Sequence, residues 1–194
     1  MKILKTDIDK SDEKVIGKAI DVLSDGGVIL YPTDTVYGLG ANIFDNEAVK
    51  RVFEIKRRSL LKPLSILVSS TDAIDLVAKV SSSQKEVINN YLPGPYTFIL
   101  EKKKLVPRTV TSGSSFVGVR VPDSEIARKL SGLFPITTTS ANLADKEVLS
   151  KPDDILKQLN CDVDLVIDAG PVKSRRPSVI IDYIEKDNPK IVRR

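Results

Sequence analysis

Apolar residues along the chain follow two different periods, and the two alternate. Residues 12–24 carry apolar side chains at helical spacing and stop at Gly26-Gly27, which predicts an amphipathic helix. Residues 28–31 are continuously apolar, which is typical of a strand buried on both faces, and Pro32 ends that run. Helical and strand-like segments keep alternating toward the carboxyl terminus. This pattern predicts an α/β layer architecture.

The remaining segments extend the pattern through the whole chain. Further helices are predicted at about 46–57, 72–79, 83–91, 123–131 and 153–159. Further strands are predicted at 64–68, 96–102, 116–121, 135–139, 163–168, 178–184 and 190–193. Asp45 is placed to cap the helix that follows it, and Ser83 with Glu86 has the spacing of a capping box. Because no linker, repeat or low-complexity tract interrupts the chain, residues 1–194 are expected to form one domain around a mixed open sheet.

The strand predicted at 116–121 has two chemically different faces. One face carries three valines, and the other carries Phe116, Gly118 and Arg120. An arginine inside an apolar strand is a poor choice for a plain surface, and its planar fork suits a bound anion. A purely structural domain would leave that charge unpaired, at a cost of several kcal/mol.

The composition is that of an ordinary globular protein. Hydrophobic residues make up 41% of the chain and charged residues 29%. No apolar run approaches the roughly 18 residues that a membrane span needs, and the first residues lack the apolar core of a signal peptide. The single cysteine, Cys161, excludes a disulfide within the chain and a cysteine-based metal site. A soluble, cytoplasmic protein with no membrane contact is expected.

Charge is unevenly distributed along the chain. Residues 1–50 carry a net charge of −3, and the remainder carries +7. The basic residues gather at 51–62, 102–108, 173–176 and 190–194. Each cluster alone reads as solvated surface, but four of them favour a polyanion as ligand, either a nucleoside triphosphate or RNA.

The chain contains no histidine, which removes the commonest general base and the commonest metal ligand. It also lacks a phosphate loop of the G-x-x-x-x-G-K-[ST] type. Residues 38–43 begin like a dinucleotide fingerprint but carry Ile43 where the third glycine belongs. Any catalysis must therefore use carboxylates, lysines, hydroxyls or electrostatics.

Four segments place hydroxyl-rich turns near strand ends and close to cations. They are residues 31–40, 56–64, 91–97 with the strand that includes Arg120, and 137–142. Glycines in the first segment allow the backbone to approach a ligand, and small hydroxyls and amides suit a purine or amino-acid pocket. Each segment also has a structural reading as a turn, a cap or a complement to a helix dipole.

The longest of these segments carries a family resemblance. Residues Gly26–Gly40, reading GGVILYPTDTVYGLG, resemble the signature of the YrdC family. Five shorter motifs follow in the order expected for that family: Lys56-Arg57-Arg58, Lys62-Pro63-Leu64, Pro93-Gly94-Pro95, Val119-Arg120-Val121-Pro122 and Ser140-Ala141-Asn142. The resemblance covers essentially the whole chain, and its specificity lies in the long first segment.

The resemblance implies an open α/β fold with a deep basic cleft and an L-threonylcarbamoyladenylate synthase activity. Such an enzyme is a nucleotidyltransferase that condenses L-threonine, bicarbonate or CO2, and ATP into threonylcarbamoyl-AMP and pyrophosphate, for modification of tRNA next to the anticodon. The residues implied to contact threonine are Thr33, Arg120, Ser140 and Ser178. The residues implied to contact ATP are Lys56, Arg58, Asn142, Ser150 and Arg193, with Lys56 and Arg58 acting in catalysis. Mg²⁺ is expected on the phosphates, with ligands that the sequence does not identify.

Two departures from the family pattern affect the expected adenosine contacts. Leu143-Ala144-Asp145 replaces a usual Ser-Gly pair, which bears most on Ser150, and Ser178-Val179 replaces a usual Ser-Thr pair. A downstream threonylcarbamoyl transferase is the implied partner, with tRNA or double-stranded RNA as a further ligand. The alternative is an RNA-binding protein without catalysis, which would explain the cations but not the hydroxyl-rich turns. A carbamoyltransferase-like enzyme is a third reading, although such enzymes need further domains.

Overall fold

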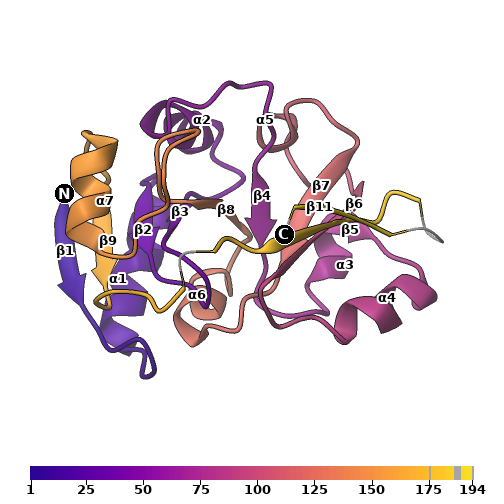
Figure 1. The fold of residues 1–194 in the computed structure, drawn as a ribbon, viewed down its shortest axis with the longest axis horizontal. Helices are drawn as coiled ribbons and strands as arrows, with labels where there is room; N and C mark the ends of the chain where they lie inside the picture. Colours follow the sequence, from indigo (N-terminus) through magenta and orange to yellow (C-terminus); the bar gives the residue numbers. More distant parts are fainter. Residues whose placement is uncertain (175, 186–188, 194) are drawn as a thin grey trace.

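The computed structural model describes residues 1–174, 176–185 and 189–193 (Figure 1). Arg175 and Arg194, which belong to two of the basic clusters, lie outside this part of the chain. The described strands are β1 (Lys2–Lys5), β2 (Ile29–Tyr31), β3 (Gly38–Gly40), β4 (Ser65–Leu67), β5 (Ala78–Lys79), β6 (Tyr96–Lys102), β7 (Phe116–Arg120), β8 (Ile136–Ser140), β9 (Leu165–Asp168), β10 (Val179–Asp182) and β11 (Lys190–Arg193). The sequence pattern predicted eight of them and missed the short β1, β3 and β5.

The described helices are α1 (Glu13–Ser24), α2 (Asn46–Ile55), α3 (Ile74–Val77), α4 (Ser82–Asn89), α5 (Arg108–Thr111), α6 (Glu125–Leu130) and α7 (Pro152–Leu159). The predicted cap of α2 is confirmed, because the Asp45 carboxylate accepts a hydrogen bond from the Ala48 amide at 2.9 Å. The capping box predicted at Ser83 is wrong: Ser81 and Gln84 form it instead. The earlier register lets the Gln84 side chain turn inward, where it donates to the Tyr183 carbonyl at 3.2 Å.

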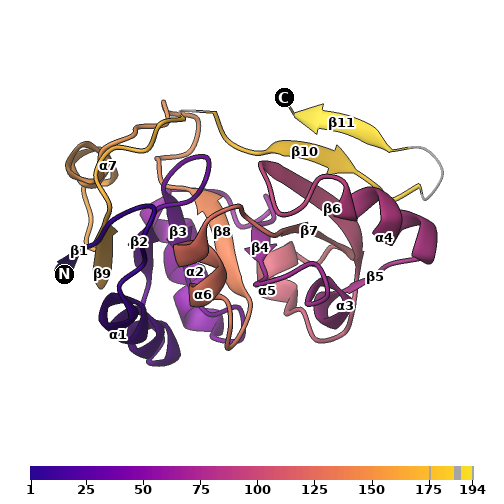
Figure 2. The same ribbon diagram turned by 90° about the horizontal axis from the view of Figure 1, so that it is seen from below.

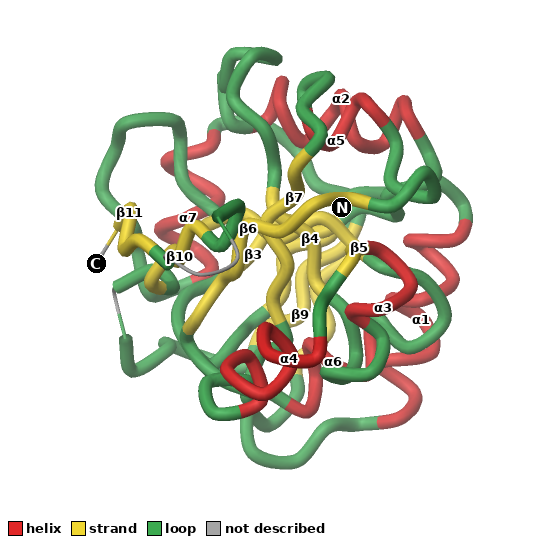
Figure 3. Tube along the Cα trace, turned by 90° about the vertical axis from the view of Figure 1, so that its right-hand side faces the viewer, coloured by secondary structure: helices red, strands yellow, loops and turns green. Residues whose placement is uncertain are grey.

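One mixed sheet runs through the described residues, in the order β1-β9-β2-β3-β8-β4-β7-β6-β10-β11, with β5 on the side of β6. The centre of the sheet contains both parallel and antiparallel strand pairs, since β4 runs parallel to β7 and antiparallel to β8. The predicted mixed open α/β sheet is therefore confirmed. Figure 3 shows the strands gathered in the centre, with α1, α2, α3 and α5 on one side and β10 and β11 on the other.

Two apolar clusters hold the sheet between helices. Ile29 and Tyr31 of β2 pack in the cluster that α1 and α6 supply, whereas Leu30 packs in the cluster that α2 and α7 supply. Alternate residues of one strand thus face opposite layers, as predicted for a run that is apolar throughout. No helix in the described ranges is long and apolar enough to cross a membrane.

The two C-terminal strands, β10 and β11, form a hairpin at the end of the sheet. β10 pairs in parallel with β6 and antiparallel with β11, and Figure 2 shows this hairpin lying over one side of the molecule. β11 is exposed along its whole length. The hairpin brings residues 178–185 and 189–193 over strands from the middle of the chain, and this arrangement closes one wall of the cavity described below.

Candidate active site

A cavity of about 530 Å³ lies on one face of the sheet, lined by β3, β4, β6, β7, β8, β10 and β11 and by the loop after α2. The sheet is hollow there because its inward residues are small. Ser65 of β4 pairs with Thr138 of β8, and Gly118 of β7 pairs with Ile99 of β6. A Cβ atom built on Gly118 would lie 2.5 Å from the Ser65 hydroxyl oxygen, so even a methyl group there would fill the floor.

Four cations and no carboxylate belong to the described lining. Arg58, Lys62, Arg120 and Arg193 come from the loop after α2, from β7 and from β11, and so from distant parts of the chain. The pKa of Arg193 is lowered first by burial and then by the positive charges of Arg120 and Arg58, because Arg193 lies close enough to each of them to be repelled. Such a site favours a bound anion that neutralises them.

Arg120 is the most rigidly held of these cations. It is 4% exposed, and its guanidinium donates to the Thr35 hydroxyl at 2.8 Å and to the Asp34 carboxylate at 2.5 Å. Burial lowers the pKa of Arg120, and Asp34 opposes that shift. The Nε atom of Arg120 and the second oxygen of Asp34 are buried without a hydrogen-bond partner in the described structure. The predicted anion clamp therefore has a counter-ion that sequence reasoning missed.

Thr33 lines the cavity but uses its hydroxyl for its own turn. The Oγ1 atom donates to the Val36 carbonyl at 2.6 Å and accepts from the amides of Thr35 and Val36 at 3.1 and 3.2 Å. These three bonds take up the proton and both lone pairs of the hydroxyl. The direct contact between Thr33 and threonine stays a prediction, while the structure shows Thr33 shaping the loop that carries Asp34.

Lys56 and Asn142 lie behind the cavity wall rather than in it. The Lys56 ammonium donates to the Ser140 carbonyl, to the Asn142 carbonyl at 2.7 Å and to the Asn142 side-chain oxygen at 3.2 Å. Burial lowers the pKa of Lys56 to about 7, with a further contribution from the charge of Arg58. Ser140 lines the cavity, and its hydroxyl donates to Asn142 at 2.6 Å. Lys56 thus orders the Ser-Ala-Asn turn in this structure.

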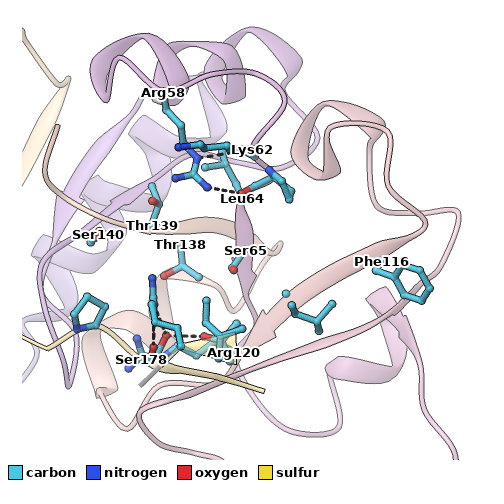
Figure 4. Close-up of a pocket in the computed structure, with 18 of the residues that line it drawn as sticks. Arg58, Lys62, Leu64, Ser65, Phe116, Arg120, Thr138, Thr139, Ser140 and Ser178 are labelled. Carbon is cyan, nitrogen blue, oxygen red and sulfur yellow. Dashed lines mark hydrogen bonds between the residues drawn. The ribbon is translucent and has the colours of Figure 1, made fainter. Parts of the chain in front are cut away.

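Arg58 and Arg120 are shown far apart in the close-up of the cavity, with Thr138 and Thr139 between them (Figure 4). Arg58 is only partly buried and donates to the Lys62 carbonyl at 3.1 Å and the Pro63 carbonyl at 3.0 Å. The loop thus holds Arg58 through its own backbone carbonyls. The cavity is consequently charged at both ends and lined with hydroxyls in the middle.

Ser178 joins the C-terminal hairpin to the cavity floor. Its hydroxyl lies 2.7 Å from the hydroxyl of Thr97 on β6, and its carbonyl accepts from Arg193 at 2.8 Å. Thr97 was part of a turn motif in the sequence, but no pattern assigned it to the site. Val179, which departs from the family pattern, pairs with Tyr96 and leaves Ser178 in the lining.

Ser150 is the predicted residue least connected to the cavity. It does not belong to the described lining, and its carbonyl accepts from the Val172 amide at 3.1 Å. The structure thus brings Thr33, Arg58, Arg120, Ser140, Ser178 and Arg193 to one cavity. Lys56 and Asn142 support that cavity from behind, and the role of Ser150 stays a prediction.

Comparison with known proteins gives consistent matches over the chain. A model of the Sua5, YciO and YrdC proteins, described as "Telomere recombination", matches residues 21–194. A protein of Methanocaldococcus jannaschii, provisionally named threonylcarbamoyl-AMP synthase, is 44% identical over 162 residues, which are 84% of this chain and 76% of that protein.

Two solved structures share the fold over nearly all of this chain. Sua5 of Pyrococcus abyssi in complex with L-threonine has a TM-score of 0.89 and 33% identity, and the match covers 99% of this chain and 56% of that one. Escherichia coli YciO, an uncharacterised protein, has a TM-score of 0.88 and 31% identity, with coverage of 99% and 93%. The chain thus spans about half the length of the Sua5 structure and nearly all of YciO.

Proposed function

The chain belongs to the Sua5/YciO/YrdC family, and we propose that it is an L-threonylcarbamoyladenylate synthase. It condenses L-threonine, bicarbonate or CO2, and ATP into threonylcarbamoyl-AMP and pyrophosphate. By reaction it is a nucleotidyltransferase, because an adenylyl group moves from ATP to a carbamate oxygen. The relatives that support this proposal are the proteins named threonylcarbamoyl-AMP synthase and the Sua5 structure that holds L-threonine.

The observation that carries the proposal is the convergence of Arg58, Arg120 and Arg193 on one hydroxyl-lined cavity. The reaction joins two anions, a carbamate and a triphosphate, which repel each other in water. Fixed guanidinium groups reduce that repulsion and hold the reacting oxygen near the α-phosphate. About 530 Å³ is also within the usual range of a small-molecule site.

The two ends of the cavity suit different substrates. Arg120, buried and aligned by Asp34 and Thr35, is proposed to take the threonine carboxylate, with Ser178 and Ser140 beside it. Arg58 is proposed to contact the triphosphate from the opposite end, and Arg193, which donates to the Ser178 carbonyl, from the side of the C-terminal hairpin. Lys56 and Asn142 support the Ser140 turn from behind and reach ATP only if that turn opens.

The reaction then proceeds in two steps. The neutral threonine nitrogen attacks the carbon of CO2 and loses a proton, which forms the carbamate. A carbamate oxygen attacks the α-phosphorus of ATP, the bond to the bridging oxygen breaks, and pyrophosphate leaves with the electron pair. Neither step forms a covalent bond to the protein, which fits a chain without histidine. The protein contributes position and charge neutralisation.

Mg²⁺ is proposed to enter with ATP as part of the substrate. No group of three acidic, cysteine or histidine side chains in the described residues could hold a metal ion, and Asp34 is engaged by Arg120. Mg²⁺ normally keeps several water ligands and binds phosphate oxygens. The ion would reduce the charge of the triphosphate beside Arg58 and Arg193.

The proposed product serves tRNA modification through a downstream threonylcarbamoyl transferase, and the tRNA substrate implies a cytoplasmic location. RNA binding without catalysis is not favoured, because the cations of the lining surround a hollow that an RNA duplex cannot enter. The two functions also respond differently to salt, since RNA binding would weaken steeply as salt rises.

Pyrophosphate release from ATP by the purified protein tests the proposal. We expect release only when L-threonine, bicarbonate and Mg²⁺ are all present, together with a product that has the mass of threonylcarbamoyl-AMP. A folded protein that releases no pyrophosphate under these conditions, or that releases it equally without threonine, would contradict the proposal.

A further inference from the structure

Thr97 is a buried polar residue of the cavity that the proposed chemistry leaves without a role. It is 2% exposed and lies on β6, where it pairs with Ile180 of β10. Its methyl group packs against the β7 backbone, because a Cβ atom built on Gly118 would lie 3.2 Å from the Thr97 Cγ2 atom. That packing orients the side chain and directs its hydroxyl to Ser178.

The hydrogen bond between the two hydroxyls can run in either direction, and the surroundings select one. In the described residues, Ser178 is the hydrogen-bond partner of the Thr97 hydroxyl, at 2.7 Å. Both residues line the cavity, but Thr97 is the less exposed of the two, at 2% against 7% for Ser178, and a buried hydroxyl that keeps its proton unpaired pays a desolvation cost; we therefore take Thr97 as the donor. The Ser178 oxygen therefore accepts, and its own proton is left for another acceptor.

Arg193 supports the same direction. Its guanidinium donates to the Ser178 carbonyl at 2.8 Å and lies 3.5 Å from the Ser178 hydroxyl oxygen, on the donor side of that contact. Because an arginine has only donors, the Ser178 oxygen faces donors from both Thr97 and Arg193. The remaining direction for the Ser178 proton is the cavity, which Ser178 lines.

We infer that Thr97 is a positioning residue that turns the Ser178 hydroxyl into a hydrogen-bond donor toward an acceptor oxygen of the bound amino acid. This inference rests on the proposed function and adds a residue to its specificity. Thr97 touches no substrate in this arrangement and acts only through Ser178. Without the Thr97 hydroxyl, Ser178 can rotate its proton to other directions, and its contact with the amino acid weakens.

The test compares Thr97→Val, which keeps the shape and loses the hydroxyl, with Thr97→Ser, which keeps the hydroxyl and loses the methyl group. We expect Thr97→Val to raise the KM for L-threonine by about 10-fold, with the KM for ATP within about 2-fold. Thr97→Ser should stay within about 3-fold of the wild type for both. Thr97→Ala is a second hydroxyl-free variant, used if Thr97→Val does not fold.

Two controls separate positioning from general damage. Thr111→Val also removes a buried threonine hydroxyl, one that donates to the Ser114 carbonyl outside the Ser178 contact, and should leave the KM for threonine unchanged. In a Ser178→Ala background, Thr97→Val should cause no further loss, because Thr97 acts through the group already removed.

The outcomes are distinct. A wild-type KM for threonine in Thr97→Val, equal losses in Thr97→Val and Thr97→Ser, or full additivity with Ser178→Ala would each overturn the inference while the synthase assignment stands. A wild-type protein that neither binds L-threonine nor releases pyrophosphate would overturn the proposed function and this inference with it.

Discussion

Arg120 and Arg58 are both arginines of one cavity, but the fold holds them in opposite ways. Arg120 is buried in a central strand and fixed by two side chains, Asp34 and Thr35. Arg58 lies in a partly exposed loop and is held by two backbone carbonyls of that same loop. We call the first region, with Thr97 and Ser178, the buried end, and the second, with Leu61 and Lys62, the open end.

The difference matches the roles proposed for the two ends. An amino acid is small and rigid, and rejecting its close analogues requires donors whose positions cannot adjust. A triphosphate is larger and highly charged, and a partly exposed cation on a loop can neutralise part of its charge. Leu61 at the open end is 86% exposed, so this end has little packing to fix it. We therefore expect the buried end to determine selectivity for the amino acid and the open end to determine affinity for the triphosphate.

The largest effect is expected from Arg120→Ala. Loss of a charge-assisted contact with the threonine carboxylate should lower kcat/KM for threonine by at least about 100-fold, with ATP affinity changed by less than about 3-fold. The variant also leaves Asp34 buried without its counter-ion, which costs about 3–5 kcal/mol of the free energy of unfolding. Steady-state kinetics and chemical denaturation measure the two quantities.

A double variant separates those two effects. Adding Asp34→Asn to Arg120→Ala removes the orphaned charge, so stability should largely return while threonine use stays lost. If folded Arg120→Ala kept the threonine affinity of the wild type, that result would contradict the assignment of the amino acid to the buried end.

Arg58→Ala should have the opposite effect to Arg120→Ala, impairing the use of ATP and not that of threonine. We expect the KM for ATP to rise about 10- to 30-fold while the KM for threonine stays within about 2-fold, since Arg58 is proposed to contact the triphosphate. The melting temperature should hardly change, because the side chain is partly exposed and its partners are carbonyls of its own loop. Equal increases in both KM values would show that the ends are not chemically separate.

Gly118→Ala tests the shape of the floor near the buried end. The added methyl group would lie 2.5 Å from the Ser65 hydroxyl oxygen, so we expect about a 10-fold rise in the KM for threonine and a loss of about 1–3 kcal/mol in stability. Combination with Ser65→Ala should recover part of both. Gly17→Ala is the matched control, because its added methyl group meets nothing within 4 Å and should stabilise α1 by about 0.5–1 kcal/mol.

The pH dependence of stability is expected to depend on Lys56. Burial lowers the pKa of Lys56 from 10.5 to about 7, so the unfolded chain holds this proton more tightly than the folded protein does. Stability should therefore rise as pH increases from 7 toward 10, by at most about 1.4 kcal/mol per pH unit. Denaturation curves of the wild type and Lys56→Met at several pH values measure this slope, and parallel pH profiles for the two proteins would contradict it.

The sequence anticipated much of the fold because hydrophobic period is a local property. Helix α1, strand β6 and the cap at Asp45 were predicted within a residue or two. Strands β1, β3 and β5 were missed because each is short and none lies in a longer apolar run such as residues 28–31 or 64–68. The capping box was misplaced because the sequence offers two overlapping boxes, Ser81 with Gln84 and Ser83 with Glu86, and the structure uses the first, in which Gln84 also bonds to Tyr183.

Within the candidate site, the sequence by itself determined the residue types and which of them sit next to each other along the chain. It pointed to Arg120 in an apolar strand, to the hydroxyl-rich turns and, through family resemblance, to the chemistry. Only the tertiary structure decided that Asp34 partners Arg120, that Thr97 meets Ser178, and that Lys56 lies behind the wall. Those contacts join residues 81 to 86 positions apart and depend on how distant strands and loops are brought together, which no local pattern of side chains specifies.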